Sequence, residues 1–270
     1  MLVLQRLAGA VLVLFFVTSA PQAWSNGGKS TSANIPKFGT HDYIAFQGYK
    51  LAGRPDFIKQ NLNAFFIGTE APDSGKALFP SAAGTYADTL KCHCILFDVN
   101  GEVSKDRLEV RVQEEFDKAK AALASGNRKL AAFYAGAMAH YLGDLSQFCH
   151  IMGVESHWGS ENKTVHSNYE KVVDKTIKFQ TRSSSLLDPF IHMVSLPGTT
   201  ARAVALSVAL FAENGGAGAD PRVMHTHYQT LMTKHKNTDP MAWDALFRDQ
   251  TGKSINVSVN GVAKTLKMLP

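Results

Sequence analysis

A segment near the middle of the chain, from His140 to Glu170, constrains the fold more than any other part of the sequence. It reads HYLGDLSQFCH and, after a polar stretch, HSNYE. His140 and Asp144 are four residues apart, as are His166 and Glu170, so each pair lies on one helix face, about one turn apart. Two side chains at that separation can bind one metal ion, and zinc accepts imidazole nitrogen together with carboxylate oxygen. The segment therefore predicts metal-binding helices, and two such pairs indicate more than one metal ion.

A single histidine–carboxylate pair of this kind is common by chance and is usually a surface or capping pair. Here His150 adds a fifth candidate ligand, and the neighbours Ala137, Met138, Tyr141 and Leu142 are apolar or aromatic, which indicates burial. An unpaired histidine or aspartate is unfavourable in such surroundings. Metal binding is one way to compensate for that burial.

Helical spacing of apolar residues recurs along most of the chain. Residues 128–147 are alanine-rich and apolar nearly all round, so this helix is predicted to run through the core. The other predicted helices cover residues 41–52, 57–67, 106–124, 166–179, 200–213, 221–235 and 240–248. The helix over residues 57–67 is expected to end at Gly68, and a loop is expected over residues 74–90. Residues 254–266 alternate only weakly, so their secondary structure is ambiguous. Because neither repeats nor a strand-turn-strand series occur, the sequence predicts an all-α fold, a single-domain bundle of helices.

The first 23 residues have the pattern of a secretory signal peptide. One basic residue precedes a short apolar run, and small residues follow it. The apolar run is too short to span a bilayer comfortably, although an uncleaved anchor is the alternative. Cleavage after Ala20 or Ala23 would give a secreted protein, extracellular or periplasmic. The second site would make Trp24 the first residue of a catalytic domain over residues 24–270.

The charge of the chain excludes little. Its formal net charge of +5 at pH 7 fits an anionic substrate but is equally ordinary for a secreted protein. No runs of basic residues with interleaved aromatic residues occur, so nucleic-acid binding has no direct support.

Three cysteines are too few for a disulfide scaffold. Cys92 and Cys94 flank His93, and Cys149 precedes His150. If both histidines serve one site, Cys149 lies near the other two cysteines and a disulfide there is a hypothesis. The simpler expectation is that the odd thiol is buried.

Ordered motifs in the first two thirds of the chain resemble the zinc-dependent phospholipase C and class I nuclease family. The core of the resemblance is HYLGDxxQxxH followed by HSxYE, within an alanine-rich helix and the helix after it. Upstream support comes from Gly39-Thr40-His41, from Ala71-Pro72-Asp73, from His93 with Asp98 after it, and from Trp24 near the cleavage site. The resemblance spans roughly residues 24–180.

The resemblance implies three zinc ions in a cleft of an all-α bundle. The ligand sets that it implies are Asp73, His93, His140 and Asp144 for one zinc ion; His150, His166 and Glu170 for a second; and the amino group and carbonyl of Trp24 with His41 and Asp144 for a third. Asp144 would bridge two metal ions, because a carboxylate has two oxygens and its charge offsets the repulsion between dications. Asp73 would orient the attacking water and act as general base.

The implied reaction is hydrolysis of a phosphodiester by metal-activated water. A phospholipase C of this kind acts on phospholipid at a membrane surface and releases diacylglycerol. Positions that would form an aromatic box for choline hold Ser74, Leu90 and Gly27, so the headgroup stays open. No dedicated protein partner is indicated, and a monomer is expected.

Two other functions compete with the phospholipase. The first is a secreted zinc nuclease or 3'-nucleotidase with the same metal cluster, the one alternative in which nucleic acid is the partner. The interval of seventeen residues from Trp24 to His41 favours the phospholipase, since the nucleases have a much shorter one. The second is a non-catalytic secreted zinc-binding protein, which the nine filled ligand positions argue against.

The loop between His150 and His166 contains further candidates. His157 is expected to be a solvated loop residue rather than part of a cleft. Phe148 and Trp158 are candidates for a rim that faces lipid.

Overall fold

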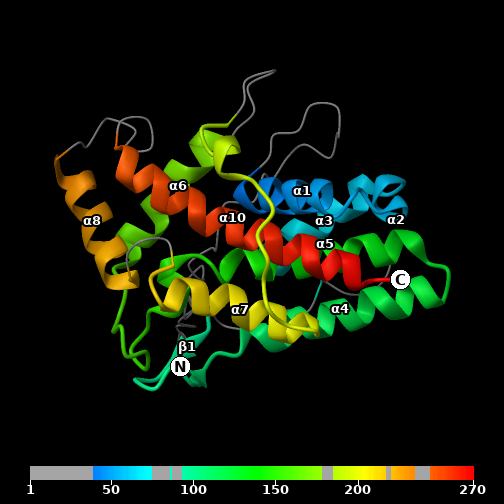
Figure 1. Ribbon diagram of the computed structural model, residues 1–270, viewed down its shortest axis with the longest axis horizontal. Coiled ribbons are helices and arrows are strands. Elements are labelled where there is room, and N and C mark those ends of the chain that lie inside the picture. The colour runs from blue at the N-terminus through cyan, green and yellow to red at the C-terminus, as the bar shows by residue number, and fades with distance from the viewer. Residues whose placement is uncertain (1–38, 75–85, 87–92, 178–184, 217–219, 235–243) are drawn as a thin grey trace, which may run out of the picture.

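The computed structural model describes residues 39–74, 86, 93–177, 185–216, 220–234 and 244–270. The helices are α1 (Thr40–Leu51), α2 (Asp56–Lys59), α3 (Leu62–Ser74), α4 (Leu108–Ala124), α5 (Arg128–Asp144), α6 (Lys163–Ile177), α7 (Ala201–Glu213), α8 (Pro221–Lys234) and α10 (Ala245–Met268). Short 3-10 helices follow α5 and precede α7, namely η1 (Phe148–Ile151) and η2 (Asp188–Phe190). The prediction of an all-α fold is confirmed (Figure 1). The predicted signal peptide, Trp24, Cys92 and most of the predicted 74–90 loop lie outside the described residues.

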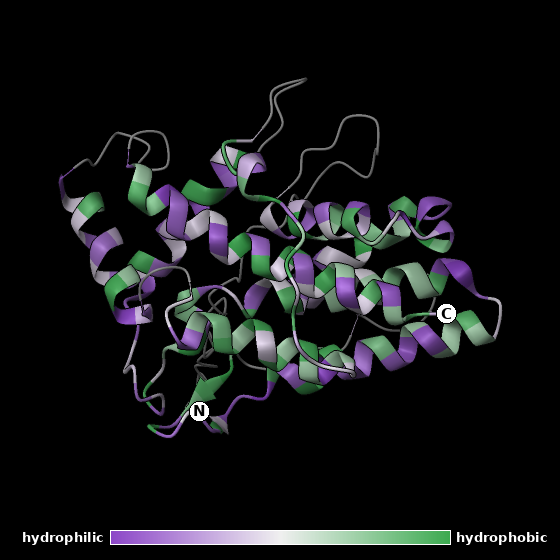
Figure 2. Ribbon diagram, in the orientation of Figure 1, coloured by the Kyte–Doolittle hydropathy of each residue, from purple (hydrophilic) through white to green (hydrophobic). Residues whose placement is uncertain are grey.

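Helix α5 is the centre of the bundle, as its apolar sequence predicts. It packs against α1, α2, α3, α4 and α10, and from Ala131 onward all of its residues except Tyr134 are buried. The side chain of Asn127 caps its start by accepting a hydrogen bond from the Leu130 N–H at 3.1 Å. By contrast, α4 alternates hydrophilic and hydrophobic residues along its length, as expected for a helix with one exposed face (Figure 2).

Two glycines bring α3 and α5 into backbone contact. A Cβ atom added to Gly68 would lie 2.0 Å from the carbonyl oxygen of Phe133, and one added to Gly136 would lie 2.0 Å from that of Phe65. Only glycine permits this approach. It fixes the end of α3 beside the second half of α5, and this places Asp73 next to His140.

Helix α3 does not end at Gly68 as the sequence predicts. It continues to Ser74 with Pro72 inside its last turn. The prediction treats glycine and proline as helix-breaking residues, whereas Gly68 serves the contact with α5. Proline lacks the N–H that would bond to the Gly68 carbonyl, so the last turn of α3 has one hydrogen bond fewer.

The segment with ambiguous periodicity, residues 254–266, belongs to α10, a helix of 24 residues. Most of its residues from Ser254 to Leu266 are buried, so no polar face interrupts the apolar pattern. Its valines and isoleucine favour strands by propensity, and packing overrides that preference. Figure 1 shows α10 crossing the bundle beside α1 and α7, with the extended chain before α7 lying over it.

A small hairpin accompanies the helices. Strand β1 (Leu96–Phe97) pairs antiparallel with β2 (Val103–Lys105). The turn between them is held by Asp98, which accepts hydrogen bonds from the N–H groups of Asn100 and Glu102 at 2.8 and 3.0 Å. Strands this short show no alternation that sequence analysis can detect.

Among the described residues, no helix has both the length and the apolar character that crossing a membrane requires.

Candidate metal centre

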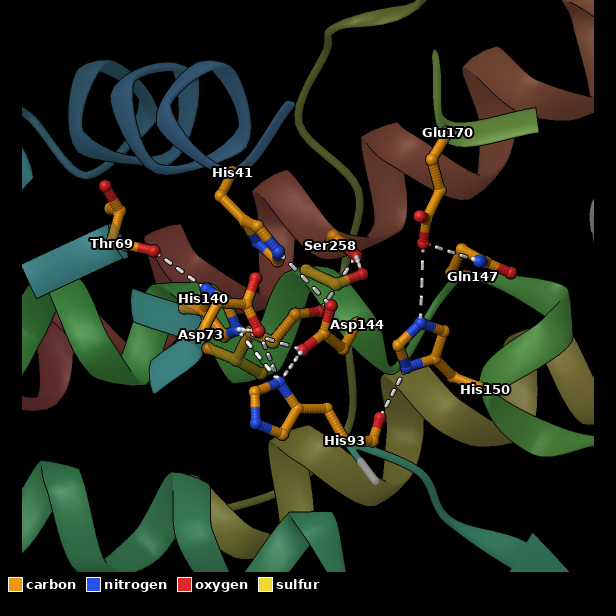
Figure 3. A network of polar contacts seen from close by, with 12 residues as sticks. His41, Thr69, Asp73, His93, His140, Asp144, Gln147, His150, Glu170 and Ser258 are labelled. Atoms are coloured by element: carbon orange, nitrogen blue, oxygen red, sulfur yellow. Dashed lines mark hydrogen bonds and ion pairs between the residues drawn. The ribbon is translucent and has the colours of Figure 1, made fainter. Parts of the chain in front are cut away.

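The predicted ligands come from several helices whose ends meet inside the bundle. His41 lies in the first turn of α1, and Asp73 lies in the last turn of α3. His140 and Asp144 end α5. After α5, His150 lies in η1, and His166 and Glu170 lie in α6. Figure 3 shows the side chains of His41, Asp73, His93, His140 and Asp144 pointing toward one another.

Five distances that join atoms of four of these side chains lie between 3.1 and 3.6 Å. His93 Nδ1 lies 3.3 Å from Asp73 Oδ1, 3.2 Å from Asp144 Oδ2 and 3.1 Å from His140 Nε2. His140 Nε2 in turn lies 3.3 Å from Asp144 Oδ2 and 3.6 Å from Asp73 Oδ1. Ligands of one tetrahedral zinc ion stand roughly 3.3 Å apart when each bond is about 2.0–2.1 Å. The spacing of the four atoms therefore suits a shared metal ion.

Asp144 also faces His41. Its Oδ1 atom lies 3.4 Å from His41 Nε2, and the His41 ring stacks on His140 with 3.7 Å between ring centroids. Gly143 makes room for that ring, because a Cβ atom there would lie 3.0 Å from His41 Nδ1. The two oxygens of Asp144 thus point toward different sets of histidines, as a bridging carboxylate requires.

A second group lies where η1 meets α6. His166 Nε2 is 2.8 Å from Glu170 Oε1, and His150 Nε2 is 3.8 Å from the same oxygen. The Gln147 side chain donates a hydrogen bond to Glu170 Oε1 at 3.2 Å and orients the carboxylate (Figure 3). The pair His140 and Asp144 therefore belongs to the first group, and the pair His166 and Glu170 belongs to the second.

Burial makes these arrangements unfavourable without a further partner. His41, His140 and Asp144 have side chains that are 0 % exposed. Both nitrogens of His41, both oxygens of Asp144 and Nε2 of His150 are buried and make no hydrogen bond among the described residues. Buried polar atoms without hydrogen bonds are rare and cost free energy. A metal ion would supply the missing interaction, so the residues fit the zinc ions that the sequence predicts.

Burial and neighbouring charges together set the protonation of the first group. Burial alone would raise the pKa of Asp144, but the neighbouring His140 and His41 rings outweigh it and hold that pKa well below its usual range. Burial lowers the pKa of His41 far below its ordinary value, and the nearby His140 adds to this effect. An ionised Asp144 beside a neutral His41 is the protonation state in which both can bind a cation.

The structure brings eight of the nine predicted ligands into these two groups, and Trp24 lies outside the described residues. It also shows two oxygen-bearing groups that no sequence motif selects. The carbonyl of Thr69 accepts a hydrogen bond from His140 Nδ1 at 2.7 Å, and Glu161 contacts His166. Neither contact follows from spacing along the chain.

The loop between the two groups corrects two expectations. His157 is not solvated, because its side chain is 19 % exposed and its Nε2 atom lies 3.2 Å from Glu213 Oε1. Phe148 is buried against the ring of Tyr169, 4.8 Å away, so it forms no lipid-facing rim. Trp158 donates a hydrogen bond to Glu213 at 2.7 Å and is half-buried.

The hypothesis of a disulfide from Cys149 is wrong. Cys149 is a free, buried thiol, while Cys94 is in a disulfide. The simpler expectation, that the odd thiol is buried, is confirmed for Cys149. Burial raises its pKa well above the ordinary value for a thiol.

Comparison with known proteins places this geometry in context. A family model described as zinc dependent phospholipase C matches residues 38–250. A search of curated proteins finds no match. Among solved structures, the chain is similar to the alpha toxin from Clostridium absonum, with 18 % identity and a TM-score of 0.46 over 86 % of this chain and 64 % of that one. The alpha-toxin of Clostridium perfringens avian strain SWCP gives 18 % identity and a TM-score of 0.47 over 92 % of this chain and 65 % of that one. The chain thus spans less than two thirds of the length of either toxin.

Proposed function

The chain belongs to the zinc-dependent phospholipase C family, and we propose that it hydrolyses the glycerol-side phosphodiester bond of phospholipids at a membrane surface. The family match confirms the resemblance that the sequence motifs carry. The observation that supports the activity best is the close grouping of Asp73, His93, His140 and Asp144, in which five spacings lie between 3.1 and 3.6 Å.

The proposed cluster holds three zinc ions. Asp73, His93, His140 and Asp144 would hold one, and His150, His166 and Glu170 would hold a second. The third would bind His41, the second oxygen of Asp144 and the amino terminus of Trp24. Bound zinc supplies Lewis-acid activation of water and of the phosphoryl group.

Asp73 is the residue we propose to orient the attacking water and accept its proton. Its side chain is 5 % exposed and that of His93 is 10 % exposed, whereas those of His140 and Asp144 are fully buried. The group is therefore reached from the side of Asp73 and His93. A carboxylate at that edge is close enough to solvent to pass a proton onward, while Asp144 is enclosed by histidines.

The N-terminal residues are proposed to direct secretion and, after cleavage, to complete the third zinc site. Residues 1–23 would be a signal peptide, and residues 24–270 a single secreted, monomeric catalytic domain. Cleavage after Ala23 gives Trp24 the free amine that the third zinc site requires, since an amide nitrogen does not bind zinc in this way.

The alternative is a zinc nuclease or 3'-nucleotidase with the same ligands. A direct comparison of substrates separates the two. Purified zinc-loaded protein is incubated with phospholipid vesicles and, separately, with single-stranded nucleic acid, and the products are analysed by mass spectrometry. We expect diacylglycerol and a phosphorylated headgroup, with loss of activity in chelator and recovery on adding zinc. Nucleotide release with intact lipid would favour the nuclease.

The role of Asp73 is tested in the same assay. Asp73→Asn should lower kcat at least about 100-fold, the lower range for loss of a general base. Asp249→Asn is the matched control, because Asp249 is 42 % exposed and pairs with Lys253 at 2.8 Å on the surface. Undiminished turnover in Asp73→Asn with full zinc content would refute the proposed role.

A further inference from the structure

Three histidines of the proposed zinc sites share one arrangement. In His140, Nδ1 faces the Thr69 carbonyl oxygen at 2.7 Å, and in His150 it faces the His93 carbonyl oxygen at 2.5 Å. A carbonyl oxygen only accepts hydrogen bonds, so Nδ1 carries the proton in both rings and Nε2 presents its lone pair. In each ring Nε2 is the atom that points to the proposed metal ligands.

His166 faces a different group at the equivalent position. Its Nε2 atom lies 2.8 Å from Glu170, while its Nδ1 atom lies 2.5 Å from Oε2 of Glu161. The group that faces Nδ1 is therefore a carboxylate rather than a backbone carbonyl. No motif of the sequence analysis includes Glu161.

Glu161 is held in place by the residue that follows it. The N–H of Asn162 donates to His225 Nε2 at 2.9 Å, and the Asn162 side chain accepts the N–H of Thr164 at 2.9 Å at the start of α6. The side chain of Glu161 is 17 % exposed and that of His166 is 4 % exposed. The backbone that follows Glu161 is thus held, and the contact is largely shielded from water.

The contact is a close carboxylate–imidazole pair, and we assign it to positioning rather than to another metal site. Cys149, Glu161 and His166 each offer an atom within 4.8 Å of the others, so they meet a loose criterion for binding a metal. However, Oε2 and Nδ1 are 2.5 Å apart, shorter than any spacing given above for two ligands of one proposed zinc ion. Neither atom makes a hydrogen bond elsewhere among the described residues, so the two form one charge pair.

We propose that Glu161 is a positioning residue for His166. Its carboxylate accepts the Nδ1 proton, holds the ring so that Nε2 faces Glu170 and His150, and makes that nitrogen a better donor to zinc. Carboxylates that bond to the remote nitrogen of a zinc-bound histidine act in this way, and losing one costs about 10–100-fold in metal affinity or activity. The inference rests on the proposed zinc sites.

Zinc affinity tests this without reference to turnover. Glu161→Gln keeps the size of the side chain and removes its charge, and Glu155→Gln is the matched control in the same loop. Glu155 is 54 % exposed and pairs with Lys105 on the surface. Each protein is dialysed against graded concentrations of a zinc chelator, and the zinc remaining per chain is counted by elemental mass spectrometry.

We expect one zinc ion of Glu161→Gln to leave at a free zinc concentration about 10–100-fold higher than in the wild-type protein. The control should follow the wild type, and Glu161→Asp, which retains the charge, should lose less affinity than the glutamine variant. Circular dichroism of the zinc-free proteins reports whether each variant folds. Wild-type zinc retention by Glu161→Gln would overturn the inference, even if that variant were less stable. A wild-type protein that binds no zinc would instead contradict the proposed function.

Discussion

The backbone contact between α3 and α5 links the stability of the fold to the metal centre, and Gly136→Ala tests that link. The new Cβ atom would lie 2.0 Å from the Phe65 carbonyl oxygen, whereas real Cβ atoms essentially never come closer than 3.0 Å to another atom. The two helices must therefore move apart locally by about 1 Å, the difference between these distances. The atom in the way belongs to the backbone, so no side-chain rotation relieves the contact.

Two opposing effects set the magnitude. Replacing glycine by alanine inside a helix stabilises it by about 1 kcal/mol. Overpacking a core destabilises by about 1–3 kcal/mol, occasionally more, and a gap of 0.5–1 Å forfeits roughly a quarter to a half of each contact energy along the interface. We expect the second effect to fall in the upper part of its range, because backbone blocks the new atom, and the protein to lose roughly 1–2 kcal/mol net. That loss corresponds to a fall of roughly 2–8 °C in Tm for a chain of this size.

The same displacement should reach the metal centre. His140 follows Gly136 by one turn of α5, and Asp73 ends the helix that must move. Their nearest atoms are 3.6 Å apart, so a shift of about 1 Å changes the ligand spacing by more than a quarter. Errors of about 1 Å in a reactive site can cost on the order of 100-fold. The affinity for zinc should therefore fall at the group that contains Asp73 and His140, while the zinc ion at His150, His166 and Glu170 should stay bound.

The assay is thermal unfolding followed by circular dichroism, with and without zinc, together with zinc content after dialysis. Gly126→Ala is the control, because nothing lies within 4 Å of its Cβ position. Gly126 has a φ of +75°, so alanine there should destabilise by about 1–2 kcal/mol through backbone strain, without loss of zinc. A Gly136→Ala protein with wild-type Tm and wild-type zinc content would refute the reasoning.

Two further predictions concern single residues. Asp144→Asn should reduce bound zinc from three ions per chain to one, because Asp144 faces both His41 and His140, while the group around Glu170 does not include it. Elemental mass spectrometry measures this, and three zinc ions in the variant would show that Asp144 does not bridge two of them. Cys149 should resist a thiol-alkylating reagent in the folded protein and react after unfolding, because it is buried with a raised pKa. Peptide mapping before and after denaturation measures this, and rapid labelling of folded protein would mean that the site opens.

The sequence predicted the centre of the site because the ligands there lie within single helices. Each of the two pairs, His140 with Asp144 and His166 with Glu170, is separated by four residues. The helical repeat alone therefore puts both members of a pair on one face of a helix. His41, Asp73 and His93 reach the site through tertiary packing, and the family resemblance rather than spacing selected them. Glu161 had no signal at all, since its contact depends on how a loop is held.

The errors in the fold have a common cause. Gly68 appeared to end a helix because glycine has low helix propensity, yet its missing side chain is what α5 requires. The buried α10 lacked a polar stripe, so its periodicity could not be recognised. In both cases packing decided the structure where local preference pointed elsewhere.

The measurement that tests the central claim most directly is the zinc content of the purified mature protein, by elemental mass spectrometry, with the amino terminus sequenced in the same sample. The account predicts close to three zinc ions per chain in protein that begins at Trp24. No bound zinc, even after reconstitution, would mean that the buried histidines and carboxylates of this chain do not form a metal centre, and would contradict the account.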